Sequence, residues 1–122
     1  MKESLIITTK GGKEAPARVR MALTALHAEL GEKCEDVRLL ASELVTSAVV
    51  HSRLGAESFL RFMLSAAPER ITGALEYPGE PFTAGPELEG DRLGLSLVES
   101  LSDTWGFERT GDQNRVWFEI SR

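Results

Sequence analysis

The chain has 122 residues, 42% of them hydrophobic and 27% charged, which is typical of a globular protein and predicts a single domain over residues 1–122. Its net charge is −5 and no run of Lys or Arg forms a basic stripe. This argues against nucleic acid as the main partner, because phosphate contacts need clustered cations. No apolar run approaches the roughly 20 residues that span a bilayer, which argues against a membrane segment. The single cysteine, Cys34, excludes an internal disulfide and fits a reducing compartment, so we expect a cytoplasmic protein.

The first half of the sequence predicts one strand followed by two helices. Residues 5–9 are rich in Ile and Thr and are followed by two glycines, as is common for short strands. Pro16 suits the first turn of a helix that would end at Gly31, and its expected buried stripe is Val19, Leu23, Leu26 and Leu30. A second helix is expected from about residue 35 to residue 52, with a buried stripe formed by Val37, Leu40, Leu44 and Ala48.

The second half of the sequence predicts four strands and one helix. Alternation of apolar and polar residues indicates a strand at 58–65, a turn over residues 67–70 joins it to a second strand at 71–77, and helical spacing indicates a helix over 92–102. The tail predicts a hairpin with strands at 104–108 and 115–120. The resulting order, β-α-α-β-β-α-β-β, predicts an α+β sandwich with helices on one face of a mostly antiparallel sheet.

Residues 78–91 form a connection that is too long for an ordinary turn. The segment contains three prolines and three glycines. Connections of this length in a compact domain are usually lids, binding loops or disordered segments. We therefore expect this segment to be a functional element.

Four blocks of sequence, in this order and spacing, resemble the GHKL ATPase/kinase superfamily over about residues 15–120. Within that superfamily the chain is most similar to the anti-sigma-factor serine kinases. The blocks are Glu43-Leu-Val-Thr-Ser-Ala-Val-Val-His51, Tyr77-Pro-Gly79, Leu93-Gly-Leu-Ser-Leu-Val98, and the closing pieces Asp103-Thr-Trp-Gly106 and Arg115-Val-Trp-Phe-Glu119.

The resemblance implies a Bergerat-type two-layer α/β sandwich that holds Mg-ATP between its helices and a lid loop. Family members phosphorylate a serine of an anti-anti-sigma partner and sequester a sigma factor. Their helix block supplies a glutamate as general base and an asparagine as a magnesium ligand, and a strand-end aspartate binds the adenine amino group. Carried over, this makes Glu43 the candidate catalytic base and Ser47 the candidate magnesium ligand. The candidate ATP-binding positions are then Ser47, His51, Tyr77, Gly79, Arg92, Gly94 and Leu95.

Each kind of nucleotide contact is weaker in this sequence than in the family. Ser47 replaces the asparagine, and a serine hydroxyl is a shorter and weaker magnesium ligand than an amide oxygen. Tyr77 replaces the aspartate, and a phenol is bulkier and lacks the negative charge, so the alternative is that it fills the pocket. Glu76 is not a substitute, because adjacent strand residues face opposite sides of a sheet. Glu43 has the alternative of being a solvated helix carboxylate.

The phosphate region departs from the family as well. The long connection carries four carboxylates, which repel a triphosphate unless cations intervene: Glu80, Glu87, Glu89 and Asp91. Asp91, Arg92 and Leu93 stand where glycines are usual, and their β-carbons obstruct a close approach of the backbone to phosphate.

These departures favour an anti-sigma-like regulatory protein, a pseudokinase with weak or no ATP binding that acts in transcription regulation. Its partner would be a sigma factor or an anti-anti-sigma protein of the STAS type, and a homodimer is plausible by resemblance. One alternative is an active Mg-ATP-dependent serine-protein kinase that phosphorylates an anti-anti-sigma factor. Another is a sensor that binds a different small molecule in the altered pocket.

Overall fold

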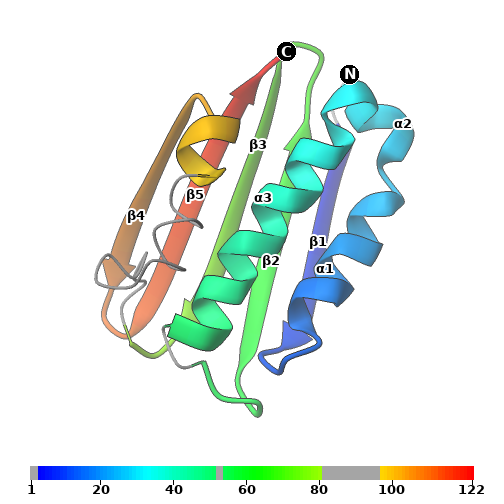
Figure 1. Ribbon diagram of the computed structural model, residues 1–122. Coiled ribbons are helices and arrows are strands. Elements are labelled where there is room, and N and C mark those ends of the chain that lie inside the picture. Colours follow the sequence, from blue (N-terminus) through cyan, green and yellow to red (C-terminus); the bar gives the residue numbers. More distant parts are fainter. Residues whose placement is uncertain (1–2, 52–53, 81–96) are drawn as a thin grey trace.

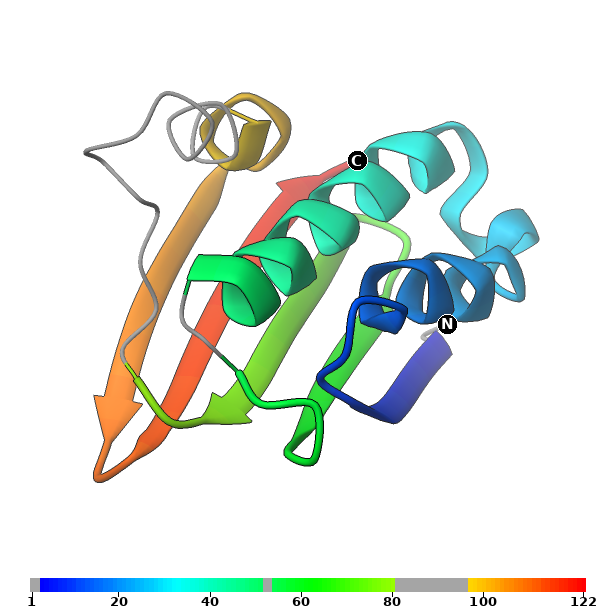
Figure 2. The same ribbon diagram turned by 60° about the horizontal axis from the view of Figure 1, so that its bottom comes forward.

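The chain folds into a five-stranded antiparallel sheet with helices on one face, as the computed structural model shows for residues 3–51, 54–80 and 97–122 (Figures 1 and 2). The strand order is β1-β2-β3-β5-β4, and each neighbouring pair is antiparallel. The predicted α+β fold class is confirmed. The strands are β1 (Glu3–Lys10), β2 (Phe59–Ala66), β3 (Arg70–Pro78), β4 (Thr104–Thr110) and β5 (Gln113–Ser121).

The first expected helix is interrupted. It consists of α1 (Ala15–Thr24) and the short α2 (His27–Leu30), followed by the 3-10 turn η1 (Gly31–Lys33). Between α1 and α2, the N–H groups of Ala25 and Leu26 donate to carbonyls three residues back, so the last turn tightens. Gly31 has a φ of 57°, a left-handed conformation that favours glycine, and it ends α2 as expected. All four residues of the expected apolar stripe are buried.

The second expected helix changes its winding inside the block that resembles the GHKL superfamily. The α-helix α3 (Cys34–Thr46) is followed by a π-helical turn, η2 (Ser47–His51). The expectation of one α-helix to residue 52 is therefore wrong. A π turn bonds each N–H to a carbonyl five residues back and is frequent at functional sites. Ala48, the last residue of the expected buried stripe, lies within this turn and is still fully buried.

The core lies between the helices and one face of the sheet. The inward-facing residues of β2, β3 and β5 alternate along each strand, and the expected stripe of α3 packs onto them. The rings of Phe62 and Phe118 stack with centroids 6.4 Å apart. Gly73 pairs with Phe118 across the strands, and a β-carbon at Gly73 would overlap that ring, so the packing requires glycine there.

The segment that joins β3 to β4, residues 79–103, is described only in part. Residues 97–101 are helical and belong to the expected helix over 92–102, whose first residues lie outside the described part of the chain. The long connection lies outside it from residue 81 onward. None of the described helices is both long enough and apolar enough to cross a membrane.

Candidate functional site

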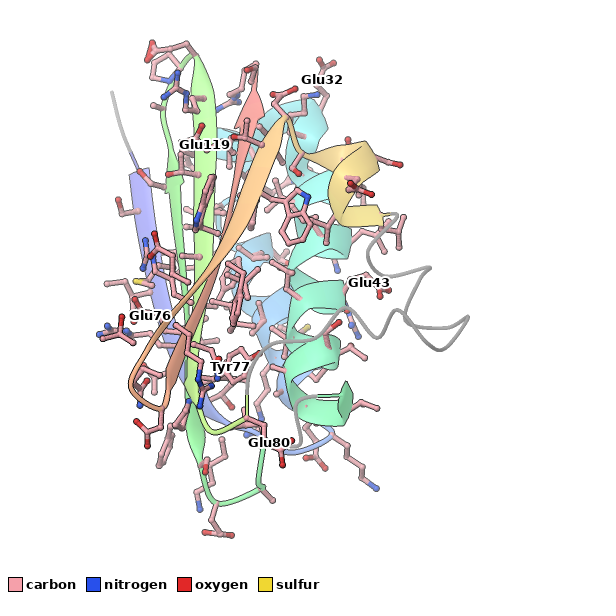
Figure 3. The ribbon with its side chains drawn as sticks, turned by 90° about the vertical axis from the view of Figure 1, so that its left-hand side faces the viewer. Glu32, Glu43, Glu76, Tyr77, Glu80 and Glu119 are labelled. Atoms are coloured by element: carbon pink, nitrogen blue, oxygen red, sulfur yellow. The ribbon has the colours of Figure 1, made fainter. Side chains whose placement is uncertain are left out.

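The described candidate residues come from the end of α3, the start of η2 and the end of β3. Glu43 is half-buried on α3, and Ser47 is the first residue of η2. Neither side chain forms a hydrogen bond or ion pair with another described residue. Figure 3 shows Glu43 on the helix layer, with Tyr77 between that layer and the sheet. The side chain of His51 lies outside the described part of the chain, as do Arg92, Gly94 and Leu95.

Tyr77 belongs to the hydrophobic core. Its side chain is 1% exposed and is among the largest fully buried side chains of the described residues. It lies on the same face of β3 as Ile71 and Leu75, which is the face covered by the helices. The position at which the resemblance implies a carboxylate for adenine is therefore filled by an aromatic ring.

Glu76 lies on the opposite face of β3, as the alternation of the strand predicts (Figure 3). Its carboxylate forms ion pairs with Arg61 at 2.7 Å and with Arg115 at 2.6 Å. The hydrogen bond from Arg61 is the main reason that the pKa of Glu76 is lowered from its ordinary value. Burial opposes this shift, and Arg115 adds to it. Glu76 is therefore an ionised component of the open sheet face and is not available to the candidate nucleotide site.

A buried amide next to Tyr77 is a feature of the site that sequence reasoning missed. Asn114 pairs with Tyr77 in the β3–β5 register and is 1% exposed. Its Nδ2 donates to the carbonyl oxygens of Tyr77 at 3.3 Å and Glu80 at 2.8 Å, and its Oδ1 accepts from Arg109 at 2.8 Å. The sequence did contain a signal for this buried amide. Asn114 is an even number of residues from Val116, Phe118 and Ile120, so its side chain points to the same buried face of β5. A polar residue at an inward position requires internal partners.

The same cluster fixes the chain as it leaves β3. Gly79 has a φ of 107°, which L side chains rarely adopt, and its N–H donates to the carbonyl of Asp112 at 2.8 Å. The Arg109 guanidinium donates to the Gly79 carbonyl at 2.7 Å. Because a β-carbon at Gly79 would meet nothing within 4 Å, backbone conformation rather than space is the reason for glycine. This junction, formed by Gly79, Glu80, Arg109, Asp112 and Asn114, is called the strand-exit cluster below.

The described candidate residues have few free polar groups. The position at which the resemblance implies an adenine-binding carboxylate holds the buried Tyr77, and the neighbouring amide of Asn114 bonds to two carbonyls and a guanidinium. Among the described residues there is no group of three or more His, Cys, Asp or Glu side chains that could hold a metal ion. Glu43 provides a carboxylate that could accept a proton from a hydroxyl.

Comparison with solved structures agrees with the architecture. One similar solved structure contains the RsbU and RsbW domains of Rv1364c from Mycobacterium tuberculosis. It matches 98% of this chain with a TM-score of 0.74 and 20% identity. The fold is that of the GHKL ATPases. The histidine kinase domain of the blue-light activated kinase from Erythrobacter litoralis EL346 matches 86% of the chain with a TM-score of 0.58 and 19% identity. The histidine kinase AdeS from Acinetobacter baumannii matches 96% with a TM-score of 0.53 and 14% identity.

These similarities concern the fold and only part of each relative. The chain spans 32% of the length of the Mycobacterium tuberculosis structure, 58% of the Erythrobacter kinase domain and 67% of the Acinetobacter kinase. No protein-family model matches the sequence, and a search of curated proteins finds no match.

Proposed function

We propose that the chain is an anti-sigma-like regulatory protein that binds a sigma factor or a STAS-type anti-anti-sigma protein and binds ATP weakly or not at all. The observation that carries this proposal is the complete burial of Tyr77 at the position of the adenine-binding carboxylate. The sequence blocks that resemble the anti-sigma-factor serine kinases, and the fold shared with the RsbW-containing structure, support the class of partner.

The burial of the Tyr77 ring opposes the binding of adenine. To admit adenine, the ring has to leave the core, which costs about 1.5–3 kcal/mol of burial for a large apolar side chain. At about 1.4 kcal/mol per factor of ten, this weakens binding by roughly tenfold to a hundredfold. The aspartate that would compensate with a charge-assisted hydrogen bond is absent from position 77. The hydrophobic core of the fold is retained, whereas the residues that contact nucleotide in the family are replaced. This combination is expected of a domain that binds a protein partner.

The second candidate function is a working serine-protein kinase, in which Glu43 is the general base. The half-buried Glu43 carboxylate without a partner among the described residues is the observation in its favour. A kinase also requires a magnesium ligand, for which the Ser47 hydroxyl is weaker than the family's asparagine, and an adenine contact, for which Tyr77 has no carboxylate.

Thermal unfolding with and without millimolar Mg-ATP tests the first candidate against the second. Ligand at about a hundred times its dissociation constant stabilises a fold by about 2.7 kcal/mol. For a domain of this size, that is a rise in Tm on the order of ten degrees. We expect no such rise, together with stable capture of a purified sigma factor or STAS protein. A magnesium-dependent rise, with phosphate transfer that disappears in Glu43→Gln, would instead establish the kinase. Failure to bind either class of protein would contradict the proposed partner.

A further inference from the structure

Strand β1 is an outer strand of the sheet, and within the described part of the chain no strand pairs with its other side (Figures 1 and 2). Its ladder with β2 runs without a bulge. The N–H of Gly11 donates to the carbonyl of Ser58 at 2.8 Å, so the hydrogen-bonded pairs of this ladder contain the odd-numbered residues of β1. The backbone N–H and C=O groups of the even-numbered residues therefore point to the free edge. These residues are Ser4, Ile6, Thr8 and Lys10.

The free edge of β1 lacks the features by which natural proteins usually protect an exposed strand. Between Glu3 and Lys10 the strand has only uncharged residues, most of them β-branched and none of them glycine or proline. The strand at the opposite edge, β4, contains Gly106 and the charged residues Glu108 and Arg109. Long, regular and uncharged edges are templates for pairing with another strand. The difference between the two edges therefore indicates that β1 is the one suited to pairing.

The two most exposed of the large hydrophobic side chains in the described part of the chain flank this edge. Ile6 is 63% exposed on the open sheet face, and Met21 is 74% exposed on α1. The Nη1 of Arg18 donates to the Thr9 hydroxyl at 3.1 Å, which places this side of α1 toward β1. Met21 is three residues after Arg18, so it lies on the same side of the helix. An extended chain along β1 would therefore meet an apolar side chain on both of its faces.

The charges along the edge are concentrated at one end. Lys10 and Arg18 are exposed where the chain turns from β1 into α1, whereas residues 4–9 are uncharged. Lys10 pairs with Glu57 at 3.4 Å, and an ion pair as exposed as this one contributes little and is readily exchanged. A strand with a carboxylate beside Lys10 and no other charge matches this pattern. In the antiparallel register that pairs all the described outward residues, a second copy of β1 would place Ser4 against Lys10 and so provide no carboxylate on that face.

We propose that the free edge of β1 binds an extended segment of a different protein, which extends the five-stranded sheet by one strand. The segment runs antiparallel to β1, which is the more stable pairing. It begins with a carboxylate that pairs with Lys10 and continues with uncharged, mainly β-branched residues. Its backbone bonds to the outward N–H and C=O groups of β1, and its alternate side chains pack against Ile6 on one face and Met21 on the other. An interface of this size belongs to the weak, transient class.

Amide exchange of the full chain in the presence of a synthetic peptide tests the proposal directly. The probe has eight residues, the length of β1, and begins with aspartate followed by alternating threonine and valine. The N–H groups of Ile6 and Thr8 should exchange rapidly in the free protein and about tenfold or more slowly with saturating peptide. The N–H groups of Leu5 and Ile7 bond to β2 and should exchange slowly in both states. Nuclear magnetic resonance resolves these four amides individually.

Variants of the edge test the same contacts through the affinity for the peptide. A proline at position 8 removes one outward donor and leaves the hydrogen bonds to β2 in place. Thr8→Pro should therefore raise the dissociation constant of the peptide about tenfold or more, whereas Thr8→Ala, the matched control, should leave it within about twofold. Met21→Glu, at an exposed helix position that does not affect folding, should raise it several-fold. A peptide that begins with lysine should bind the wild type more weakly than the aspartate peptide, and Lys10→Glu should reverse that order.

Circular dichroism and Tm identify a variant that fails to fold, and Met21→Glu then replaces Thr8→Pro as the decisive variant. Absence of binding at millimolar peptide, or binding that both variants leave unchanged, would overturn the proposal. Self-association that Thr8→Pro abolishes, without peptide binding, would assign the edge to a second copy instead. These outcomes do not depend on the proposed function, which is tested by nucleotide and by sigma-factor or STAS binding.

Discussion

Glu76 and Tyr77 follow one another in β3, and the pleat of the strand sends their side chains to opposite faces of the sheet. Tyr77 fills the core beneath the helices, whereas Glu76 joins two arginines on the open face. A shift by one residue would exchange the two faces and bury a carboxylate, which is strongly unfavourable. The pair therefore maintains the register of β3 and also places an aromatic ring where the resemblance implies a carboxylate.

The charge of Glu76 predicts a pH dependence of stability. Because its folded pKa is lowered below the ordinary value of 4.5, its contribution is present above the unfolded pKa and is lost as the pH falls through the folded pKa. Partly exposed ion pairs contribute about 1 kcal/mol or less. Between pH 7 and pH 3, we expect the wild type to lose about 1 kcal/mol more of its unfolding free energy than Glu76→Gln does.

Urea titrations at several pH values, at low protein concentration, measure this difference. Glu57→Gln is the control, because the Glu57 side chain is 90% exposed and its one ion pair is with Lys10. Parallel pH profiles for the wild type and Glu76→Gln would show that the two ion pairs contribute no stability.

At the scale of elements, the end of β3 and the hairpin of β4 and β5 are held together by the strand-exit cluster. Gly79 turns the backbone with a positive φ, Arg109 and Asn114 bind the carbonyls that follow β3, and Asp112 accepts the Gly79 N–H. These groups come from segments about 30 residues apart in sequence. The cluster determines the direction in which the chain leaves the sheet toward residue 81.

Asn114→Ala should destabilise the fold by about 2 kcal/mol, because it leaves a small cavity and removes the amide partners of buried carbonyls. Gln113→Ala, at an exposed neighbouring position of β5, should change stability by less than about 0.5 kcal/mol. Chemical denaturation of the two variants provides the comparison. Equal effects at positions 113 and 114 would contradict the role assigned to the cluster.

At the scale of the whole molecule, the fold has one covered and one uncovered sheet face. Helices α1 and α3 bury the apolar residues of the first face, and the strand register aligns the outward side chains of the second face across the sheet. Exposed apolar residues on the uncovered face, such as Ile6 at 63%, lie beside aligned polar side chains that limit nonspecific association.

Much of the fold was predictable because local patterns reflect local structure. Alternation located β2 and β5, a turn signal separated β3 from β2, helical spacing located the buried stripes of the helices, and the element order predicted the sandwich. The opposite facing of Glu76 and Tyr77 followed from the period of a strand. The order of the blocks from Glu43 to Glu119 indicated the GHKL fold, which the solved structures confirm.

Other features depended on contacts between distant segments. The break after α1 and the π turn at Ser47 are changes of winding that have no proline or glycine to mark them. Asn114 satisfies the carbonyls of Tyr77 and Glu80 only because β5 lies beside β3 in the sheet.

The alignment of outward side chains on the open face depended on tertiary structure for the same reason. Side-chain period determines which residues of a strand face outward. The register between five strands determines which outward residues become neighbours. The sequence by itself therefore determined the elements and their buried faces, because these depend on local periodicity. Tertiary structure alone decided the strand-exit cluster and the alignment of outward side chains across the open face, because both arise from backbone pairing between segments far apart in the chain.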